Sequence, residues 1–302
     1  MCGIIGIYAK SESCEERLGQ HAAAMLLEMA DRGPDSAGVA IYRDPVDSAH
    51  CKLSLQASDP ACDWDQAIEA VDRSLGVERA AVIDARDALV EVRSDADQAQ
   101  AWVLRQLPSV QVVSAGRTIE IYKDAVAPAE FVERFDLASM SGTHALGHTR
   151  MATESSVTPE SSHPFSTGLD LCLVHNGSLS NHNRLRAELE REGTVFHTKN
   201  DSEVAAGYLT WRMRQGATLE QALEGCLEDL DGFYTFAVGT ADGFAVLRDP
   251  IACKPAVMAE TEEWVAMASE YRALAPLPGA AEARVWEPEP GVVYSWGRVA
   301  AR

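Results

Sequence analysis

The sequence has no apolar run approaching the roughly 20 residues that a membrane-spanning helix requires. Its first residues, Met-Cys-Gly-Ile-Ile-Gly-Ile, lack the basic region that begins a signal peptide. Basic residues are also few: 26 Lys and Arg stand against 46 Asp and Glu, a formal net charge of −20. Nucleic-acid binding relies on clustered Lys and Arg, and no such stripe is present. We therefore expect a cytoplasmic protein that binds neither a membrane nor a nucleic acid.

The seven cysteines include no C-x-x-C pair, and their number is odd. This pattern indicates neither a disulfide framework nor a zinc or iron–sulfur site. We expect no metal and no cofactor in this chain. In a reducing cytosol most of these cysteines fit small buried apolar positions. Cys2 is the exception, because of the motifs that follow it.

Hydrophobic patterning predicts a strand, a helix, a loop and a strand at the start of the chain. Small and β-branched residues alternate over 3–9, which favours a buried strand, and apolar residues recur at helical spacing over 15–29. Arg32-Gly33-Pro34-Asp35-Ser36 breaks this pattern, and 38–42 reads as a second strand.

The segment 44–141 consists of short predicted elements. In chain order they are a strand at 51–56, a helix at 64–75, strands at 80–84 and 88–93, a helix at 96–106, strands at 110–113 and 117–122, and a helix at 128–135. Strand, helix, strand, strand, helix, strand is the order of a ferredoxin-like unit. We therefore expect 44–141 to be an inserted small α/β subdomain with a ferredoxin-like order of elements.

After Gly142 strands predominate again, with few helices between them. The strands are predicted at 145–149, 169–174, 235–239, 243–248, 264–268 and 291–295, and the helices at 183–192, 202–215 and 219–230. Asn200-Asp201-Ser202 is a capping signal for the second of these helices. Many strands with few intervening helices predict a layered α+β domain.

Five short motifs follow Met-Cys-Gly-Ile in order. They are Arg32-Gly-Pro-Asp-Ser36, Gly147-His-Thr-Arg-Met-Ala-Thr153, Ser162-His-Pro-Phe165, His175-Asn-Gly177 and Asn200-Asp-Ser-Glu203. Together they resemble the class II, N-terminal-nucleophile glutamine amidotransferases. The resemblance covers about 1–43 and 142–275. It looks closest to the separately encoded glutaminase subunits of glutamate-synthase-like and N-methylglutamate-synthase-like systems.

The resemblance implies a four-layer αββα sandwich, in which two antiparallel sheets are flanked by helices. The amidotransferase domain would comprise 1–43 and 142–302, with 44–141 inserted. The nucleophile would be Cys2, exposed when Met1 is removed. Such a residue carries its own base, because an α-amine with a pKa of roughly 7.7–8.0 can relay the proton of a thiol near about 8.5.

The family pattern also assigns the other site residues. The Asn176 side chain and the Gly177 N–H would stabilise the oxyanion. Arg150, helped by the Thr153 hydroxyl, would bind the α-carboxylate of glutamine, and Asp201 its α-ammonium. Arg32 would lie behind these residues and order the loop around the nucleophile. The motif histidines, His148, His163 and His175, are expected to pack or form hydrogen bonds, since the mechanism needs no imidazole base.

Taken singly, several of these residues have simpler interpretations. Asn176-Gly177 also fits a tight turn after a strand that ends at Val174. Arg150 fits a surface ion pair, and Asp201 fits the N-cap of a helix. The order of the motifs favours the functional interpretation.

The expected activity is hydrolysis of L-glutamine to glutamate and ammonia, with the ammonia passed to a separate synthase subunit. The resemblance suggests a flavin and iron–sulfur synthase like that of glutamate synthase. One alternative is an N-terminal-cysteine amidase that acts on another amide. A second is a non-catalytic, glutamine-sensing regulatory subunit.

Overall fold

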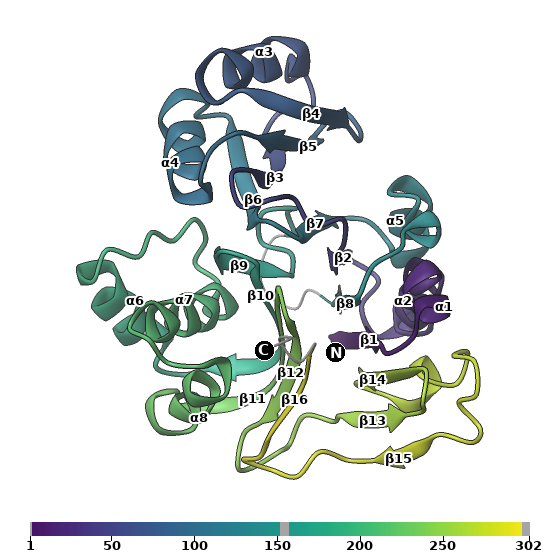
Figure 1. The fold of residues 1–302 in the computed structure, drawn as a ribbon. Coiled ribbons are helices and arrows are strands. Elements are labelled where there is room, and N and C mark those ends of the chain that lie inside the picture. The colour runs from purple at the N-terminus through teal and green to yellow at the C-terminus, as the bar shows by residue number, and fades with distance from the viewer. Residues whose placement is uncertain (1, 152–156, 298–302) are drawn as a thin grey trace.

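Two antiparallel sheets pack face to face, and helices cover the outer face of each (Figure 1). The structure is a computed structural model that describes residues 2–151 and 157–297. Three apolar cores separate the four layers: one between each sheet and its helices, and one between the two sheets. The predicted α+β sandwich is therefore confirmed.

The seven-stranded sheet has β1 as its middle strand. Its order is β15 (Arg284–Trp286), β13 (Val257–Glu260), β14 (Trp264–Ala268), β1 (Gly3–Ala9), β8 (His144–Arg150), β2 (Ser36–Tyr42) and β7 (Ile119–Asp124). Along β1, Ile4 faces the other sheet while Ile5 and Ile7 face the helices. Both faces are buried, which explains the nearly continuous apolar sequence.

The five-stranded sheet carries the second half of the motifs. Its order is β16 (Val293–Gly297), β12 (Gly243–Arg248), β11 (Gly232–Thr240), β10 (Leu171–Leu179) and β9 (Phe165–Gly168). Its outer face is covered by α6 (His182–Arg191), α7 (Asp201–Arg214) and α8 (Leu219–Asp229). These helices match the three predicted after Gly142.

The outer face of the seven-stranded sheet is covered by α1 (Glu12–Glu16), α2 (Leu18–Glu28) and α5 (Pro128–Arg134). Short 3₁₀ turns accompany them: η1 (Ala30–Arg32), η2 (Leu137–Ser139) and η3 (Tyr271–Ala273). The helix predicted over 15–29 is confirmed over Leu18–Glu28, but the chain breaks at Arg17, with φ −112° and ψ 16°, so Glu15 and Glu16 belong to α1. A Cβ at Gly19 would lie 2.0 Å from the Leu137 carbonyl oxygen, so α2 begins where glycine permits close packing.

A smaller sheet projects from this sandwich. Its order is β4 (Val77–Val82), β5 (Asp87–Val92), β3 (Cys51–Ala57) and β6 (Val110–Gly116), with α3 (Trp64–Leu75) and α4 (Ala96–Gln106) packed on one face. This is the strand order of a ferredoxin-like unit. The domain boundaries at 44 and 141 stay a prediction; β7 and α5 belong to the seven-stranded sheet and its helical layer.

Polar side chains join the small sheet to the sandwich. Lys52 Nζ forms a buried ion pair with Glu120 of β7 at 2.8 Å. Ser54 Oγ accepts a hydrogen bond from the Ile121 N–H at 3.0 Å. These residues alternate along β3 with the apolar ones that face α3 and α4, so β3 is buried on both faces but apolar on one only.

Within the described ranges, none of the helices combines the length and the apolar character needed to cross a membrane.

Candidate active site

Cys2 lies directly before β1 and is partly exposed. Because β1 is paired on both sides, the position of the residue next to the sheet is fixed. Gly3 pairs with Thr149 of β8. A Cβ at Gly3 would lie 2.9 Å from Met29 Cβ and 2.9 Å from Thr149 Oγ1. Only glycine therefore fits at position 3, next to the cysteine, where β1 begins.

Arg32 holds the backbone of Cys2. Its Nε donates to the Cys2 carbonyl oxygen at 3.2 Å, and its Nη1 forms an ion pair with Glu270. The Arg32 side chain is only 9% exposed. Its Nη2 is buried and has no hydrogen-bond partner among the described residues. The structure thus places Arg32 beside the predicted nucleophile, fixed by a carboxylate from a distant loop.

Asn176 and Gly177 lie within β10, opposite the start of β1. The Asn176 Nδ2 donates to the Cys2 carbonyl oxygen at 3.2 Å. A Cβ at Gly177 would lie 2.0 Å from the Phe233 carbonyl oxygen and 2.7 Å from His175 Nε2. The turn interpretation of Asn-Gly is wrong: β10 continues to Leu179, because its residues stay paired with β11 beyond Gly177.

Arg150 ends β8, and Ser161 holds its side chain. Its Nη1 donates to the Ser161 carbonyl oxygen at 3.2 Å and to Ser161 Oγ at 3.3 Å. The Asp35 N–H donates to the Arg150 carbonyl oxygen at 3.0 Å. The Arg-Gly-Pro-Asp loop therefore lies against the end of β8. Thr153, the predicted helper of Arg150, lies outside the described residues.

Asp201 is the first residue of α7, and Asn200 is the N-cap. The Asn200 Oδ1 accepts the Ser202 N–H at 2.9 Å, so the capping alternative for Asp201 is wrong. The Asp201 Oδ2 accepts the Leu179 N–H of β10 at 2.9 Å, and its Oδ1 lies 3.9 Å from His175 Nδ1. The carboxylate thus stands at the positive end of a helix dipole, next to the strand that carries Asn176.

The three motif histidines form a buried group around Ser202. Its Oγ lies 2.8 Å from His163 Nε2 and 2.8 Å from His175 Nδ1. His148 stacks on His163 with ring centroids 3.9 Å apart and forms a hydrogen bond to the His175 carbonyl oxygen at 3.2 Å. The prediction that these histidines pack and form hydrogen bonds is confirmed.

Burial keeps these imidazoles neutral. It lowers the pKa of His148 to about 3 and that of His175 to about 4, and it holds the pKa of His163 well below its ordinary value. The nearby Asp201 carboxylate only partly offsets this effect at His175. Each histidine lies one or two residues from a predicted site residue or from Ser161, so the group connects the segments of the site.

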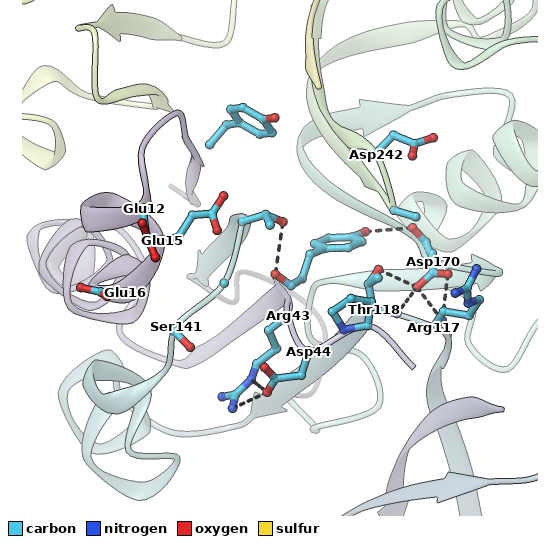
Figure 2. Close-up of a pocket in the computed structure, with 16 residues that line it drawn as sticks. Glu12, Glu15, Glu16, Arg43, Asp44, Arg117, Thr118, Ser141, Asp170 and Asp242 are labelled. Carbon is cyan, nitrogen blue, oxygen red and sulfur yellow. Dashed lines mark hydrogen bonds and ion pairs between the residues drawn. The ribbon is translucent and has the colours of Figure 1, made fainter. Parts of the chain in front are cut away.

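A cavity of about 610 Å³ opens at the other end of β1, beside Tyr8 (Figure 2). Glu12, Glu16 and Asp242 contribute carboxylates to its wall. Asp170 also lines it, but its Oδ1 accepts backbone N–H groups, including that of Ile119 at 3.0 Å. None of the described residues that line this cavity was predicted to be functional. This cavity therefore lies apart from the residues that the sequence motifs predicted to form the site.

Sequence reasoning missed three residues that support the site. Ser202 lies inside a motif, and Glu270 belongs to Ala268-Ser269-Glu270, which also resembles the family; both could have been singled out on that ground. Ser161 immediately precedes the Ser-His-Pro-Phe motif and had no signal of its own. Its contact with Arg150 appears only in the folded structure.

The fold resembles that of a solved amidotransferase. Over 98% of this chain it matches the structure of glutamine phosphoribosylpyrophosphate amidotransferase from B. subtilis, with a TM-score of 0.63 and 21% identity. The chain covers 47% of that structure, about half its length. At this identity the match shows only that the two proteins share a fold.

Sequence comparisons place the chain more closely. Residues 148–276 match the family described as glutamine amidotransferase domain. The glutamine amidotransferase-like protein GlxB of Rhizobium meliloti is 52% identical over 297 residues, which is 98% of each chain. An amidophosphoribosyltransferase of Methanocaldococcus jannaschii is 30% identical over 167 residues, 54% of this chain and 36% of that one. This chain belongs to the class II glutamine amidotransferase family and is an enzyme of that class.

Proposed function

We propose that the chain hydrolyses L-glutamine to glutamate and ammonia through a γ-glutamyl thioester on Cys2, after Met1 has been removed. The observation that carries this proposal is the 3.2 Å contact between Asn176 Nδ2 and the Cys2 carbonyl oxygen. It brings the proposed nucleophile and the proposed oxyanion donor together from strands of two different sheets. Acyl transfer needs these two groups side by side.

In the proposed reaction the Cys2 thiolate attacks the γ-carbonyl carbon of glutamine. The free α-amine of Cys2 accepts the thiol proton and then gives a proton to the departing ammonia. Water hydrolyses the resulting thioester, which releases glutamate and regenerates the thiol. The neutral, buried His148 and His175 support this route, because imidazoles with pKa values of about 3 and about 4 are poor bases at neutral pH.

Negative charge develops on the former carbonyl oxygen in the tetrahedral intermediate. The Asn176 amide and the Gly177 N–H are the proposed donors to this oxygen, each worth about 3 kcal/mol. Paired β10 and the bond to the Cys2 carbonyl fix the Asn176 side chain before substrate binds. Such donors need no reorganisation when the charge appears.

Glutamine would be selected through its amino-acid head group. We assign the α-carboxylate to Arg150, with Thr153, and the α-ammonium to Asp201. Arg150 suits this role because its guanidinium is already oriented by Ser161, and a guanidinium can bind a carboxylate with two hydrogen bonds. Arg32 would keep the Cys2 backbone in place.

The ammonia is proposed to pass to a separate synthase subunit, of the flavin and iron–sulfur type found in glutamate synthase. The relative from M. jannaschii supports transfer rather than release, since the matched part is only 36% of a longer chain whose name denotes a transferase. Purification of the native complex tests this idea. A chain that transfers ammonia at full rate without another subunit would contradict it.

The hydrolysis proposal is tested by measuring ammonia release from L-glutamine, with intact-mass analysis of the same sample. We expect activity, absence of Met1, and stoichiometric labelling of Cys2 by a glutamine-like diazoketone. Faster hydrolysis of simple amides than of glutamine would favour the amidase alternative. Glutamine binding without turnover or labelling would favour the regulatory alternative.

A further inference from the structure

Lys123 of β7 is a buried lysine whose role the proposed reaction leaves unexplained. Lys123 is only 6% exposed, and its side chain forms no ion pair with a carboxylate in the described part of the chain. The Nζ donates to the carbonyl oxygens of Glu160 at 3.2 Å and Ser162 at 3.1 Å, and lies 5.0 Å from the centre of the Phe165 ring. Burying a charge is costly, so these contacts indicate a specific role.

The two carbonyl groups that Lys123 binds flank Ser161, the residue that holds Arg150. Ser161 accepts hydrogen bonds from Arg150 Nη1 through its carbonyl oxygen and its Oγ. Gly38 of β2 lets the same segment lie directly on the sheet, since a Cβ there would be 2.1 Å from the His163 carbonyl oxygen. Lys123 therefore fixes the platform on which the Arg150 guanidinium rests.

On its other side, Lys123 is bound to the inserted sheet. Gln56 of β3 donates through Nε2 to the Lys123 carbonyl oxygen at 3.0 Å and to Asp87 Oδ1 of β5 at 2.9 Å. Both Gln56 and Asp87 are buried. A continuous path of contacts thus runs from the inserted sheet, through Lys123 and the segment around Ser161, to Arg150.

We propose that Lys123 is a positioning residue through which the inserted sheet orients Arg150 toward the α-carboxylate of glutamine. This inference rests on the proposed function, because it assumes that Arg150 binds that carboxylate. A guanidinium binds a carboxylate well only when its planar fork is correctly aimed. The insertion therefore acts on recognition of the substrate head group, and the chemistry at Cys2 does not depend on it directly.

Binding in a Cys2→Ala background tests the inference without turnover. Calorimetric titration with L-glutamine and with L-glutaminamide, whose α-carboxylate is replaced by a neutral amide, separates head-group recognition from general binding. We expect Lys123→Met to weaken glutamine binding about tenfold and to leave glutaminamide binding within about twofold. Gln56→Met, which disturbs only the link to the insertion, should weaken glutamine binding about threefold. Arg150→Met serves as the reference for a variant that no longer distinguishes glutamine from glutaminamide.

Lys52→Met is the matched control. Lys52 is also buried at the junction of insertion and sandwich, but it pairs with Glu120 and the Arg43 carbonyl oxygen, away from the segment around Ser161. It should leave the ratio of the two affinities unchanged. Equal weakening of both ligands by Lys123→Met, or no weakening, would overturn the inference. If Lys123→Met lost the preference for glutamine over glutaminamide but the wild-type enzyme did not hydrolyse glutamine, the result would refute the proposed function and leave the positioning role of Lys123 standing.

Discussion

The two ends of β1 differ in what surrounds them. At the Tyr8 end lies a cavity of about 610 Å³ with several carboxylates in its wall (Figure 2). At the Cys2 end, hydrogen bonds converge on one backbone carbonyl from Arg32, 30 residues away, and from Asn176, 174 residues away. The convergence of anchored polar groups from distant segments is what leads us to propose the Cys2 end as the reactive one.

The difference also concerns how the polar groups are held. The Asn176 side chain projects from a paired strand, and Asp201 is fixed by the Leu179 N–H at 2.9 Å. At the Tyr8 end, Glu12 and Glu16 stand on α1, a helix of five residues. Catalytic groups need a fixed orientation, so substitutions at the two ends should have very different effects on glutamine hydrolysis.

The largest effect is expected from Cys2→Ala. Loss of the nucleophile should lower kcat for glutamine hydrolysis by at least about 10⁴-fold, because no other group can form the thioester. Steady-state ammonia release measures this loss. Cys253→Ala is the matched control, since Cys253 is exposed and should be dispensable. Residual activity of Cys2→Ala above a hundredth of wild type would place the nucleophile elsewhere.

Asn176→Ala should have the next largest effect. Removing one oxyanion donor costs roughly 10²–10³-fold in kcat, with a smaller change in KM. Asn181→Ala provides a control, because the Asn181 side chain contacts the backbone at the end of α8: it donates to the Asp229 carbonyl oxygen at 2.8 Å and accepts the Asp231 N–H at 3.0 Å. A change confined to KM would mean that Asn176 binds the ground state and does not stabilise the oxyanion.

A third prediction concerns the pH dependence of stability at the Cys2 end. A histidine in the unfolded chain has a pKa near 6.5, whereas burial lowers those of His148 and His175 to about 3 and about 4. The unfolded chain therefore takes up protons that the native state cannot. Stability should be complete above about pH 6.5 and fall as the pH drops toward 4, by roughly 1.4 kcal/mol per pH unit for each such histidine.

Urea unfolding between pH 7 and pH 5 measures this dependence. His148→Gln should reduce the slope of the unfolding free energy against pH by the contribution of about one proton, or about 1.4 kcal/mol per pH unit. His50→Gln is a control of opposite sign, because the hydrogen bond to Asp47 raises the pKa of His50 and its contribution is lost as the pH rises. A slope unaffected by His148→Gln would mean that this imidazole is protonated in the folded protein.

Much of the Cys2 end could be predicted from the sequence because its residues lie in ordered motifs. β1 and the helix after Asn200 followed from apolar periodicity and capping. The extension of β10 through Gly177 could not be predicted, since Asn-Gly favours a turn locally and only pairing with β11 overrides that preference. The place of β7 beside β2 depends likewise on contacts between distant segments.

The smallest effect is expected at the Tyr8 end. Glu16→Gln and Asp242→Asn each remove one charge from the cavity wall without changing side-chain shape. Surface charges of this kind contribute little, so kcat and KM for glutamine should each stay within about twofold of wild type. A tenfold loss of activity in either variant would break the contrast between the two ends, because a cavity far along β1 would then be coupled to Cys2. An unchanged activity, with the large losses expected for Cys2→Ala and Asn176→Ala, would confine the chemistry to the end where the motifs meet.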